Sequence, residues 1–293
     1  MENKNRNYVL YLWMLPALLW VSIIIIYPLG STIYTSFFHW KGQGFAMRFV
    51  GLQNYVEVFN NMRFVNALKN NMIWLILYLV VPVLLGFFLA MLLNTGLRGE
   101  TIFKSIFYFP GVISFVAVGI VFSLIYTNRN GMLNELLKFM NLDSLTTSWL
   151  ASKIFALPVI VLASSWQYSG FCMVLFLAGL QQVPQELIEA SEIDGANFFQ
   201  RLRFIILPTI RPVTSIVILI TIINSIRIFD LVLVMTGGGP GQMTEVIGLL
   251  MYRETFTNQS WGIGATYGVV MLTLIAIPSL LYVKNMLKKE EKY

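Results

Sequence analysis

A run of charged residues between two long apolar stretches holds the residue types most able to do chemistry in this chain. Glu189, Glu192 and Asp194 supply three carboxylates in quick succession, and Gly195 and Pro208 follow them. Glycine favours sharp turns and proline favours helix starts, so the run has defined local structure. Joining two apolar segments needs far less charge than this. We therefore expect the run to contact a partner in water.

The residues around these carboxylates predict two short helices joined by a turn. Pro184 ends the preceding apolar stretch, and residues 185–191 read as a helix whose early glutamates stabilise the helix dipole. Gly195 then reverses the chain, and Asn197 can cap a second helix at 197–205 with Phe198, Phe199, Leu202 and Ile206 at helical spacing. Two interpretations remain: an amphipathic helix resting on lipid headgroups, or a docking surface for a protein. The carboxylates favour the protein, because anionic lipids repel them.

A second group of polar residues lies inside the apolar stretches and forms two helical faces. One face is spaced i, i+3, i+4, i+7, and the other follows the same periodicity further along the chain. Neutral hydroxyls and amides beside aromatic rings suit a sugar, whose hydroxyls need donors and acceptors and whose C–H face stacks on rings. The alternative is hydrogen bonding between helices, which the same residue types provide. The two faces are Ser164, Gln167, Tyr168 and Phe171, and Thr221, Asn224 and Ser225.

Arg227 and Asp230 are ionisable residues next to the second face, and such groups are costly in a membrane unless they are paired or face water. Their i, i+3 spacing permits a helical ion pair that neutralises itself near the outer membrane surface. Alternatively, Arg227 faces a cavity and binds a hydroxyl or an acidic sugar, with Asp230 orienting it. Both interpretations stay open.

Composition indicates the elements that must position these residues. The chain has 293 residues, of which 57% are hydrophobic and 12% charged, with a mean hydropathy of +0.72. A soluble domain of this size does not need so much apolar surface. About 20 apolar residues span a bilayer as a helix. We therefore predict an all-α, polytopic membrane protein with a single domain over 1–293, a loop at 184–208, and six spans at 8–38, 70–93, 102–126, 154–180, 209–235 and 263–287.

Basic residues predict the orientation of the spans. The first apolar block is too long for a signal-peptide core, so we favour a retained span over a cleaved signal. Lys and Arg concentrate near span ends on one side, which places the N- and C-termini in the cytoplasm. Basic anchors against anionic lipid also account for the net charge of +6 and leave no reason to expect nucleic-acid binding. The basic residues assigned to the cytoplasmic side are Lys4, Arg6, Arg98, Lys104, Arg201, Arg203, Arg211, Lys284, Lys288, Lys289 and Lys292.

Several chemistries are disfavoured by the residues present. Cys172 is the one cysteine and His39 the one histidine, so the sequence predicts no disulfide, no metal site and no His-based catalysis. We expect Cys172 to pack as a small apolar residue and His39 to lie at the membrane interface. Residues 237–240 read Gly-Gly-Gly-Pro and lack the Lys of a phosphate-binding loop. Any ATP-driven work must come from another chain.

Three motifs resemble those of ATP-binding-cassette (ABC) importer permeases. The pattern Glu189-Ala190-x-x-x-Asp194-Gly195-Ala196, with Ile206-Leu207-Pro208 downstream, is similar to their cytoplasmic signature loop, with Ser191 in place of the usual second Ala. The block Phe229-Asp230, Thr236-Gly237-Gly238-Gly239-Pro240, Thr244-Glu245, Tyr252 and Phe256 resembles maltose-type carbohydrate permeases, as does Gly51-Leu52-x-Asn54-Tyr55. Together these motifs cover nearly the whole chain.

This resemblance implies a type I ABC importer permease fold and a transporter in which separate chains form the membrane path, hydrolyse ATP and deliver the substrate. The chain would pair with a second, related permease above two cytoplasmic ATPase subunits that bind ATP and Mg, while an extracellular solute-binding protein delivers a carbohydrate. No cofactor is expected in this chain, and no enzyme activity. The loop would insert into the ATPase through Glu189, Ala190, Asp194, Gly195, Ala196, Phe199, Leu207 and Pro208. Both polar faces and Arg227 would line the substrate path.

Two other protein classes and several substrates remain as alternatives. A secondary carrier usually has internal repeats and buried carboxylate relays, and a membrane enzyme needs a nucleophile with a base, neither of which the spans provide. The resemblance implies a prokaryotic plasma membrane. A di- or oligosaccharide is the expected substrate, and Arg227 keeps glycerol phosphate or an acidic saccharide open.

Overall fold

The protein is almost entirely helical. The computed structural model describes residues 13–96, 99–128 and 130–290, and of 285–290 the backbone alone. Within these ranges the strands are limited to an antiparallel pair, β1 (Phe38–His39) and β2 (Arg48–Phe49). The basic anchors Lys4, Arg6, Arg98 and Lys292 and the start of the first predicted span lie outside the described residues, as do the side chains of Lys288 and Lys289. The predicted all-α class is confirmed.

Four helices in the described ranges are long and apolar enough to cross a membrane: Trp13–Thr35, α4 (Met62–Leu93), α8 (Ala156–Leu180) and Trp261–Lys284, which is part of α15 (Trp261–Glu290). Two further candidates are bent pairs. In one, α5 (Glu100–Tyr108) and the 3-10 turn η2 (Phe109–Val112) meet α6 (Phe115–Ile125) at 94°. In the other, residues Phe198–Thr209 meet α12 (Arg211–Arg227) at 73°. Counting each pair as one span gives six.

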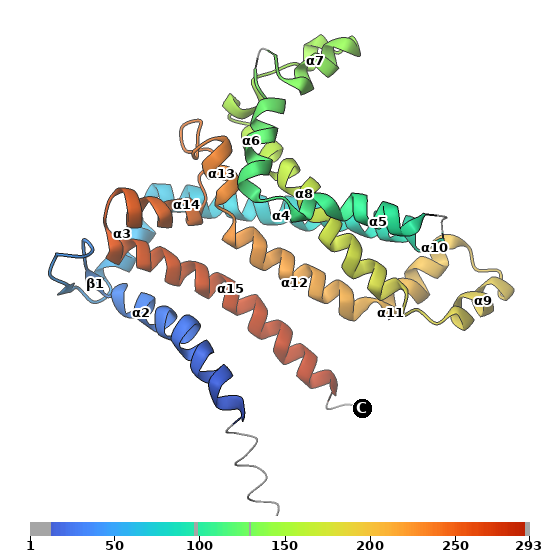
Figure 1. Ribbon diagram of the computed structural model, residues 1–293, viewed down its shortest axis with the longest axis horizontal. Coiled ribbons are helices and arrows are strands. Elements are labelled where there is room, and N and C mark those ends of the chain that lie inside the picture. The colour runs from blue at the N-terminus through green and yellow to red at the C-terminus, as the bar shows by residue number, and fades with distance from the viewer. Residues whose placement is uncertain (1–12, 97–98, 129, 291–293) are drawn as a thin grey trace, which may run out of the picture. The chain divides into compact units, whose positions relative to one another are not determined.

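The chain folds as two compact units, which are described separately. The first comprises residues 1–62 and 250–272, and the second 63–249 and 273–293. In the first lie the π-helical turn η1 (Ser22–Ile26), α2 (Tyr27–Thr35), both strands, α3 (Gln53–Asn60) and the π-helical turn η6 (Arg253–Thr257) (Figure 1). In the second lie α4 to α13, with α7 (Met132–Phe139), the 3-10 turns η3 (Asp143–Leu145) and η4 (Trp149–Ala151), and α13 (Asp230–Met235). The helix α14 (Ile247–Tyr252) crosses the boundary.

Asn54 organises the first unit. It is buried on α3, and its Nδ2 donates to the Ser36 carbonyl at 2.8 Å and the Phe38 carbonyl at 2.9 Å. The Tyr55 hydroxyl lies 2.7 Å from the Ser36 hydroxyl, and Gly51 takes a positive φ of 57° just before α3. The motif Gly51-Leu52-x-Asn54-Tyr55 therefore joins α3 to the end of α2.

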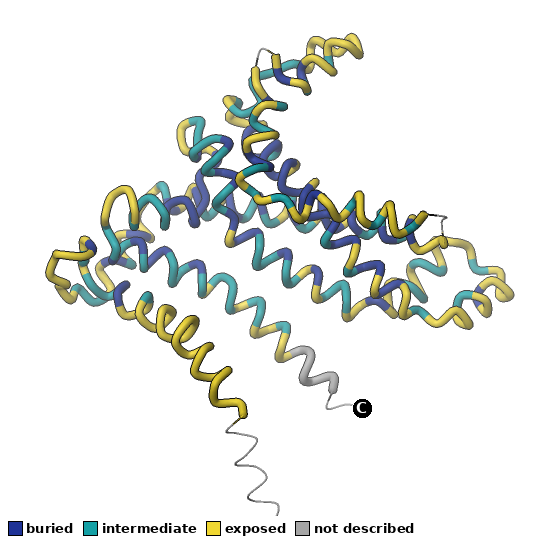
Figure 2. Tube along the Cα trace, in the orientation of Figure 1, coloured by how far each residue is buried: buried dark blue, intermediate teal, exposed yellow. Residues whose placement is uncertain are grey.

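The core of the second unit surrounds α8, which is buried along most of its length (Figure 2). It is crossed closely by α4, because a Cβ at Gly86 would lie 2.5 Å from the Cβ of Cys172 and 2.8 Å from the Met173 nitrogen. Cys172 is fully buried at this crossing, so it packs as a small side chain as expected. The close approach of two helices is what allows polar side chains on each to reach the other.

The fifth predicted span, 209–235, is broken in the structure. We expected Pro208 to start the long helix of this span. It lies instead in the short α11 (Leu207–Thr209), and α12 starts after Ile210. At its other end α12 stops at Arg227, and α13 begins only at Asp230. Pro212 at the first turn of α12 suits a helix start, since its missing N–H has no partner there anyway.

We predict that Gly86→Ala destabilises the protein, although Ala favours a helix. The added Cβ would overpack the crossing of α4 with α8, at a cost of about 1–3 kcal/mol. Gly30→Ala is the matched control, because a Cβ at that helical position meets nothing within 4 Å. Thermal unfolding in detergent measures both variants. A Gly86→Ala protein as stable as the control would contradict the close crossing.

Candidate functional site

A cavity of about 390 Å³ lies within the second unit, where α4, α8 and the ends of α12 and α13 meet the bend between η2 and α6. Its volume is in the range of small-molecule sites, roughly 300–1,000 Å³. Most of the lining is neutral, with aromatic rings, an amide from each of two helices, and one charge of each sign. The lining residues are Tyr78, Gly111, Ile113, Ser114, Phe115, Gln167, Tyr168, Phe171, Asn224, Arg227, Ile228 and Asp230.

Three aromatic rings form a stacked surface at this cavity. The rings of Tyr78 and Tyr168 are 5.0 Å apart with an interplanar angle of 19°, and those of Tyr168 and Phe171 are 5.4 Å apart at 27°. Buried hydrogen bonds hold the two tyrosines: the Ser164 hydroxyl donates to Tyr78 Oη at 3.0 Å, and Tyr168 Oη lies 3.3 Å from Thr221 Oγ1. Fixed, nearly parallel rings suit the flat C–H face of a sugar.

Gln167 presents an acceptor at the cavity that has no partner in the described protein. Its side chain is 4% exposed, and its Nε2 donates to the Ile113 carbonyl at 2.5 Å, which orients the amide. Its Oε1 is buried without a hydrogen bond, as are Trp74 Nε1 and Ser165 Oγ. Of these three residues, Gln167 is the one in the cavity lining. An unsatisfied buried acceptor costs about 1–3 kcal/mol. Water does not reach this oxygen in the described structure, so a ligand hydroxyl can donate to it only after the Gln167 side chain moves.

Arg227 and Asp230 both line the cavity, but they do not form the helical ion pair that their spacing permits. Ile228 leaves the helix with φ −59° and ψ 133°, and Phe229 has φ −157°, so the two residues lie on different helices. In the described part of the chain neither makes an ion pair, while four other pairs form, including Arg63–Glu245. The cavity therefore offers a ligand both a guanidinium and a carboxylate.

The structure brings part of the predicted substrate path together. Gln167, Tyr168, Phe171, Asn224 and Arg227 line the cavity. Ser164, Thr221 and Ser225 do not: the first two bond to the tyrosines, and Ser225 Oγ donates to the Ile222 carbonyl of its own helix. The sequence analysis did not predict that Tyr78 and Ser114 line the cavity. The spacing of Asn71, Trp74 and Tyr78, at i, i+3 and i+7, could have revealed the polar face of α4.

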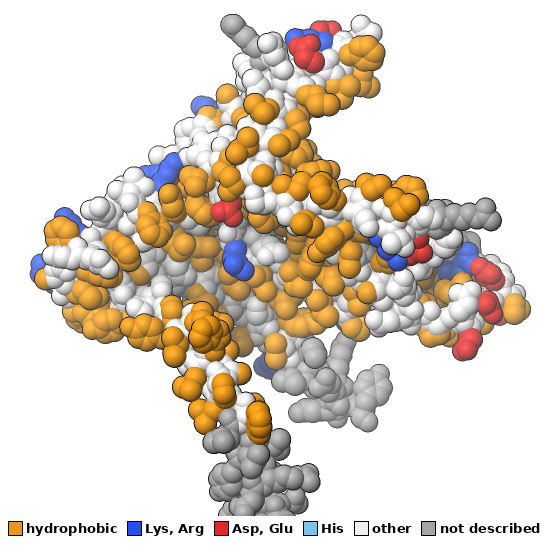
Figure 3. Space-filling view, viewed as in Figure 1, with side chains coloured by type: hydrophobic (Ala, Val, Ile, Leu, Met, Phe, Trp, Pro, Cys, Tyr) orange, Lys and Arg blue, Asp and Glu red, His pale blue; other side chains and the backbone are white. Residues whose placement is uncertain are grey.

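The charged loop has the two-helix form that the sequence predicts. It contains α9 (Gln185–Ile193), α10 (Phe198–Arg201) and the π-helical turn η5 (Leu202–Ile206). Gly195 turns the chain with φ 76°, and Asn197 caps α10 in a capping box with Gln200. Figure 3 shows acidic side chains gathered over the α9 end of the unit.

Most of the predicted coupling residues lie exposed on this loop. Phe199 is 76% exposed and Ile193 87%, which is unusual for large apolar side chains outside an interface. Exposed as well are Glu189, Ala190, Asp194, Gly195, Leu207 and Pro208, while Ala196 is half-buried. Glu192 pairs with Arg201 across the turn and ties the two helices together. Apolar and acidic groups are thus presented together on this loop.

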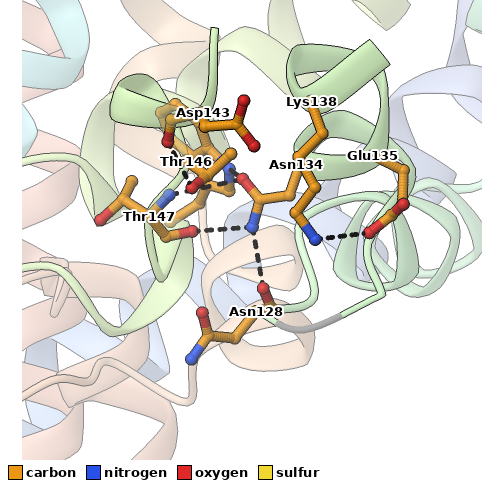
Figure 4. Close-up of polar contacts among 8 residues, drawn as sticks. Asn128, Asn134, Glu135, Lys138, Asp143, Thr146 and Thr147 are labelled. Atoms are coloured by element: carbon orange, nitrogen blue, oxygen red, sulfur yellow. Dashed lines mark hydrogen bonds and ion pairs between the residues drawn. The ribbon is translucent and has the colours of Figure 1, made fainter. Parts of the chain in front are cut away.

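The segment after α6 is held by one buried side chain, Asn134 of α7 (Figure 4). Its Nδ2 donates to the carbonyls of Asn128 at 2.9 Å and Thr147 at 3.0 Å. Its Oδ1 accepts from the Trp149 indole at 2.8 Å and the Thr147 amide at 3.4 Å. All the hydrogen-bonding capacity of this amide is therefore used to join Asn128, Thr147 and Trp149 to α7.

No three His, Cys, Asp or Glu side chains gather as a metal site in residues 13–96, 99–128 and 130–290. The cavity can therefore act through stacking, hydrogen bonds and its two charges. The cavity lies among helices that are long and apolar enough to cross a membrane, and these helices define the class as a multi-span membrane protein.

Comparison with known proteins gives the family. Residues 82–285 match the family described as binding-protein-dependent transport system inner membrane component, and the chain belongs to it. It is 37% identical over 290 residues to the osmoprotective compounds uptake permease protein of Synechocystis, covering 96% of this chain and 99% of that one. It is 31% identical over 274 residues to the trehalose/maltose transport system permease protein of Thermococcus litoralis, covering 94% and 92%.

A solved structure shows the same fold. The chain matches a permease in the crystal structure of a bacterial ABC transporter that imports the acidic polysaccharide alginate, with a TM-score of 0.79 and 22% identity, covering 97% of this chain and 98% of that one. At this identity the likeness concerns the fold alone. The predicted ABC importer permease fold is confirmed.

We predict that Asn134→Leu opens the segment around α7 without unfolding the spans. The change removes four hydrogen bonds, two of them to the partly buried carbonyls of Asn128 and Thr147. Each net hydrogen bond is worth about 0.5–1.5 kcal/mol. Limited proteolysis in lipid nanodiscs is expected to cut residues 128–149 at least several times faster. Ser144→Leu is the control, since Ser144 is exposed in the same segment. Equal cleavage of both variants would contradict the role of Asn134.

Proposed function

We propose that this chain is the permease subunit of an ABC importer for carbohydrates and forms half of the translocation path. The observation that carries the proposal is the stacked surface of Tyr78, Tyr168 and Phe171 beside the unpartnered Gln167 acceptor. Rings for the C–H face and an acceptor for a hydroxyl are what a sugar needs. The trehalose/maltose name of the relative from Thermococcus litoralis supports the same substrate class.

The charges at the cavity bear on which carbohydrate is carried. Arg227 and Asp230 together add no net charge, which favours a neutral di- or oligosaccharide. The guanidinium is exposed and unpaired with Asp230, so an acidic saccharide or glycerol phosphate is the second candidate. An acidic substrate would bind through Arg227 in a bidentate pair and would be repelled by Asp230. Arg227→Gln separates the candidates, because it abolishes uptake of an acidic substrate and weakens uptake of a neutral one only modestly.

The partners follow from what the chain lacks and from its exposed loop. Two ATPase subunits hydrolyse ATP with Mg and bind the loop 184–208, where Glu189 and Asp194 pair with basic residues of the ATPase and Gly195 permits the turn. A second, homologous permease supplies the other half of the path, and a solute-binding protein delivers the sugar from outside. Both termini face the cytoplasm of a prokaryotic cell, in agreement with the basic residues near the span ends.

Reconstituted uptake tests this function. Vesicles that contain the chain, its partner permease, the ATPase and the binding protein are expected to take up one class of labelled sugar when ATP is inside. Gly195→Asp removes both uptake and ATPase stimulation, because a side chain at φ 76° is strained and adds a charge at the turn. Gly44→Asp, at a positive φ in an open external turn, is the control and retains both. Uptake that needs no ATP and survives Gly195→Asp would indicate a secondary carrier instead.

A further inference from the structure

One buried side chain, Asn71 of α4, joins the end of one helix to the start of another. Asn71 is fully buried, and its Nδ2 donates to the Ser225 carbonyl of α12 at 3.1 Å. Its Oδ1 accepts from the Ile247 amide at 2.9 Å. Both hydrogen-bonding groups of the amide are thus directed at backbone atoms of segments far apart in sequence.

These two backbone groups are ones that their own helices leave without a partner. The last four carbonyls of a helix lack an intrahelical donor, and Ser225 is among them because α12 ends at Arg227. The first four amides of a helix lack an intrahelical acceptor, and Ile247 is the first residue of α14. In surroundings without water such groups must be satisfied by the protein. Asn71 therefore caps α12 and α14 at once.

A second set of contacts from the same helix fixes the chain just before Ile247. Arg63 holds the fully buried Glu245 through two hydrogen bonds, Nη2–Oε1 at 2.6 Å and Nε–Oε2 at 3.1 Å. Asn70 Nδ2 donates to the Glu245 carbonyl at 2.8 Å. Residues 63, 70 and 71 lie at i, i+7 and i+8, so one face of α4 makes all of these contacts.

The segment held in this way carries three residues of the cavity. Arg227, Ile228 and Asp230 lie just after Ser225, and the chain returns to α4 at Glu245. Between these points the segment closes on itself, since Thr236 Oγ1 lies 2.8 Å from Thr244 Oγ1, which also donates to the Gly239 carbonyl at 2.7 Å. Asn71 does not line the cavity itself.

We propose that Asn71 is a positioning residue for the substrate site: it fixes the break between α12 and α13 and thereby holds Arg227 and Asp230 at the cavity. The inference rests on the proposed function of that cavity. This inference gives a structural role to the motif Thr236-Gly237-Gly238-Gly239-Pro240 with Thr244-Glu245. The motif forms a closed loop, and side chains of α4 bind the chain on both sides of that loop. Asn71 acts on the substrate through the segment rather than by contact.

Asn71→Leu tests the inference with almost no change in side-chain volume. The apolar side chain makes neither hydrogen bond, so it releases the end of α12 and the start of α14. In the assembled transporter in nanodiscs, we expect amide hydrogen exchange of residues 226–247 to accelerate at least tenfold, with residues 156–180 unchanged. In vesicles, the KM for sugar uptake should rise at least fivefold, with a smaller change in the maximal rate. Asn66→Leu, exposed on the same helix, is the matched control.

The outcomes separate this inference from the proposed function. Unchanged exchange in residues 226–247 would overturn the double cap, and faster exchange with an unchanged KM would overturn the link to the substrate site. If the unmodified transporter moves no sugar, the proposed function fails, while the exchange data still decide whether Asn71 holds the segment. If Asn71→Leu does not fold, Asn71→Ser replaces it, because a short hydroxyl cannot reach both backbone groups and is expected to shift exchange in the same direction.

Discussion

The organisation of this protein depends on one constraint: polar groups between membrane-spanning helices must find partners within the protein, because lipid offers none. The close crossing of α4 with α8 at Gly86 and Cys172 makes this possible, since it brings side chains of each helix within hydrogen-bonding distance of the other. Ser164 of α8 reaches Tyr78 of α4 in this way, and Tyr168 of α8 reaches Thr221 of α12. The hydrogen bonds that fix the tyrosines also set the stacked rings of the cavity.

Two places in the cavity lining meet this constraint in an unusual way. Gln167 leaves its Oε1 without a partner at the edge of the cavity, which is the arrangement expected if a substrate hydroxyl completes it. At Ile228 the helix itself is interrupted, and Asn71 of α4 donates to one of the carbonyls set free, that of Ser225. A continuous helix over 209–235 would have let Arg227 and Asp230 pair with each other; the interruption makes both available to a ligand.

Sequence periodicity was enough to predict the helical class, the two-helix loop and the polar face of α8, because each depends on residues close together in the chain. Gly195 and Asn197 signal their local conformations directly. The break at Ile228 was not predicted, because no Pro or Gly marks it and its cause, Asn71, lies far away in sequence. The same holds for Tyr78, whose role depends on α8 packing against α4. Ser164 and Thr221 are polar residues on the predicted faces. Helical spacing alone could not tell whether their side chains line a cavity or form hydrogen bonds between helices.

We propose that Gln167 accepts a hydrogen bond from a substrate hydroxyl. Sugar uptake by Gln167→Leu in reconstituted vesicles tests this most directly. Losing one hydrogen bond of about 1–3 kcal/mol predicts a KM raised roughly five- to 100-fold, with ATPase coupling through the loop retained. Ser165→Ala is the matched control, since Ser165 Oγ is also buried without a partner but does not line the cavity, and its KM should not change. An unchanged KM in Gln167→Leu, or an equal change in both variants, would contradict the assignment of this cavity to the substrate.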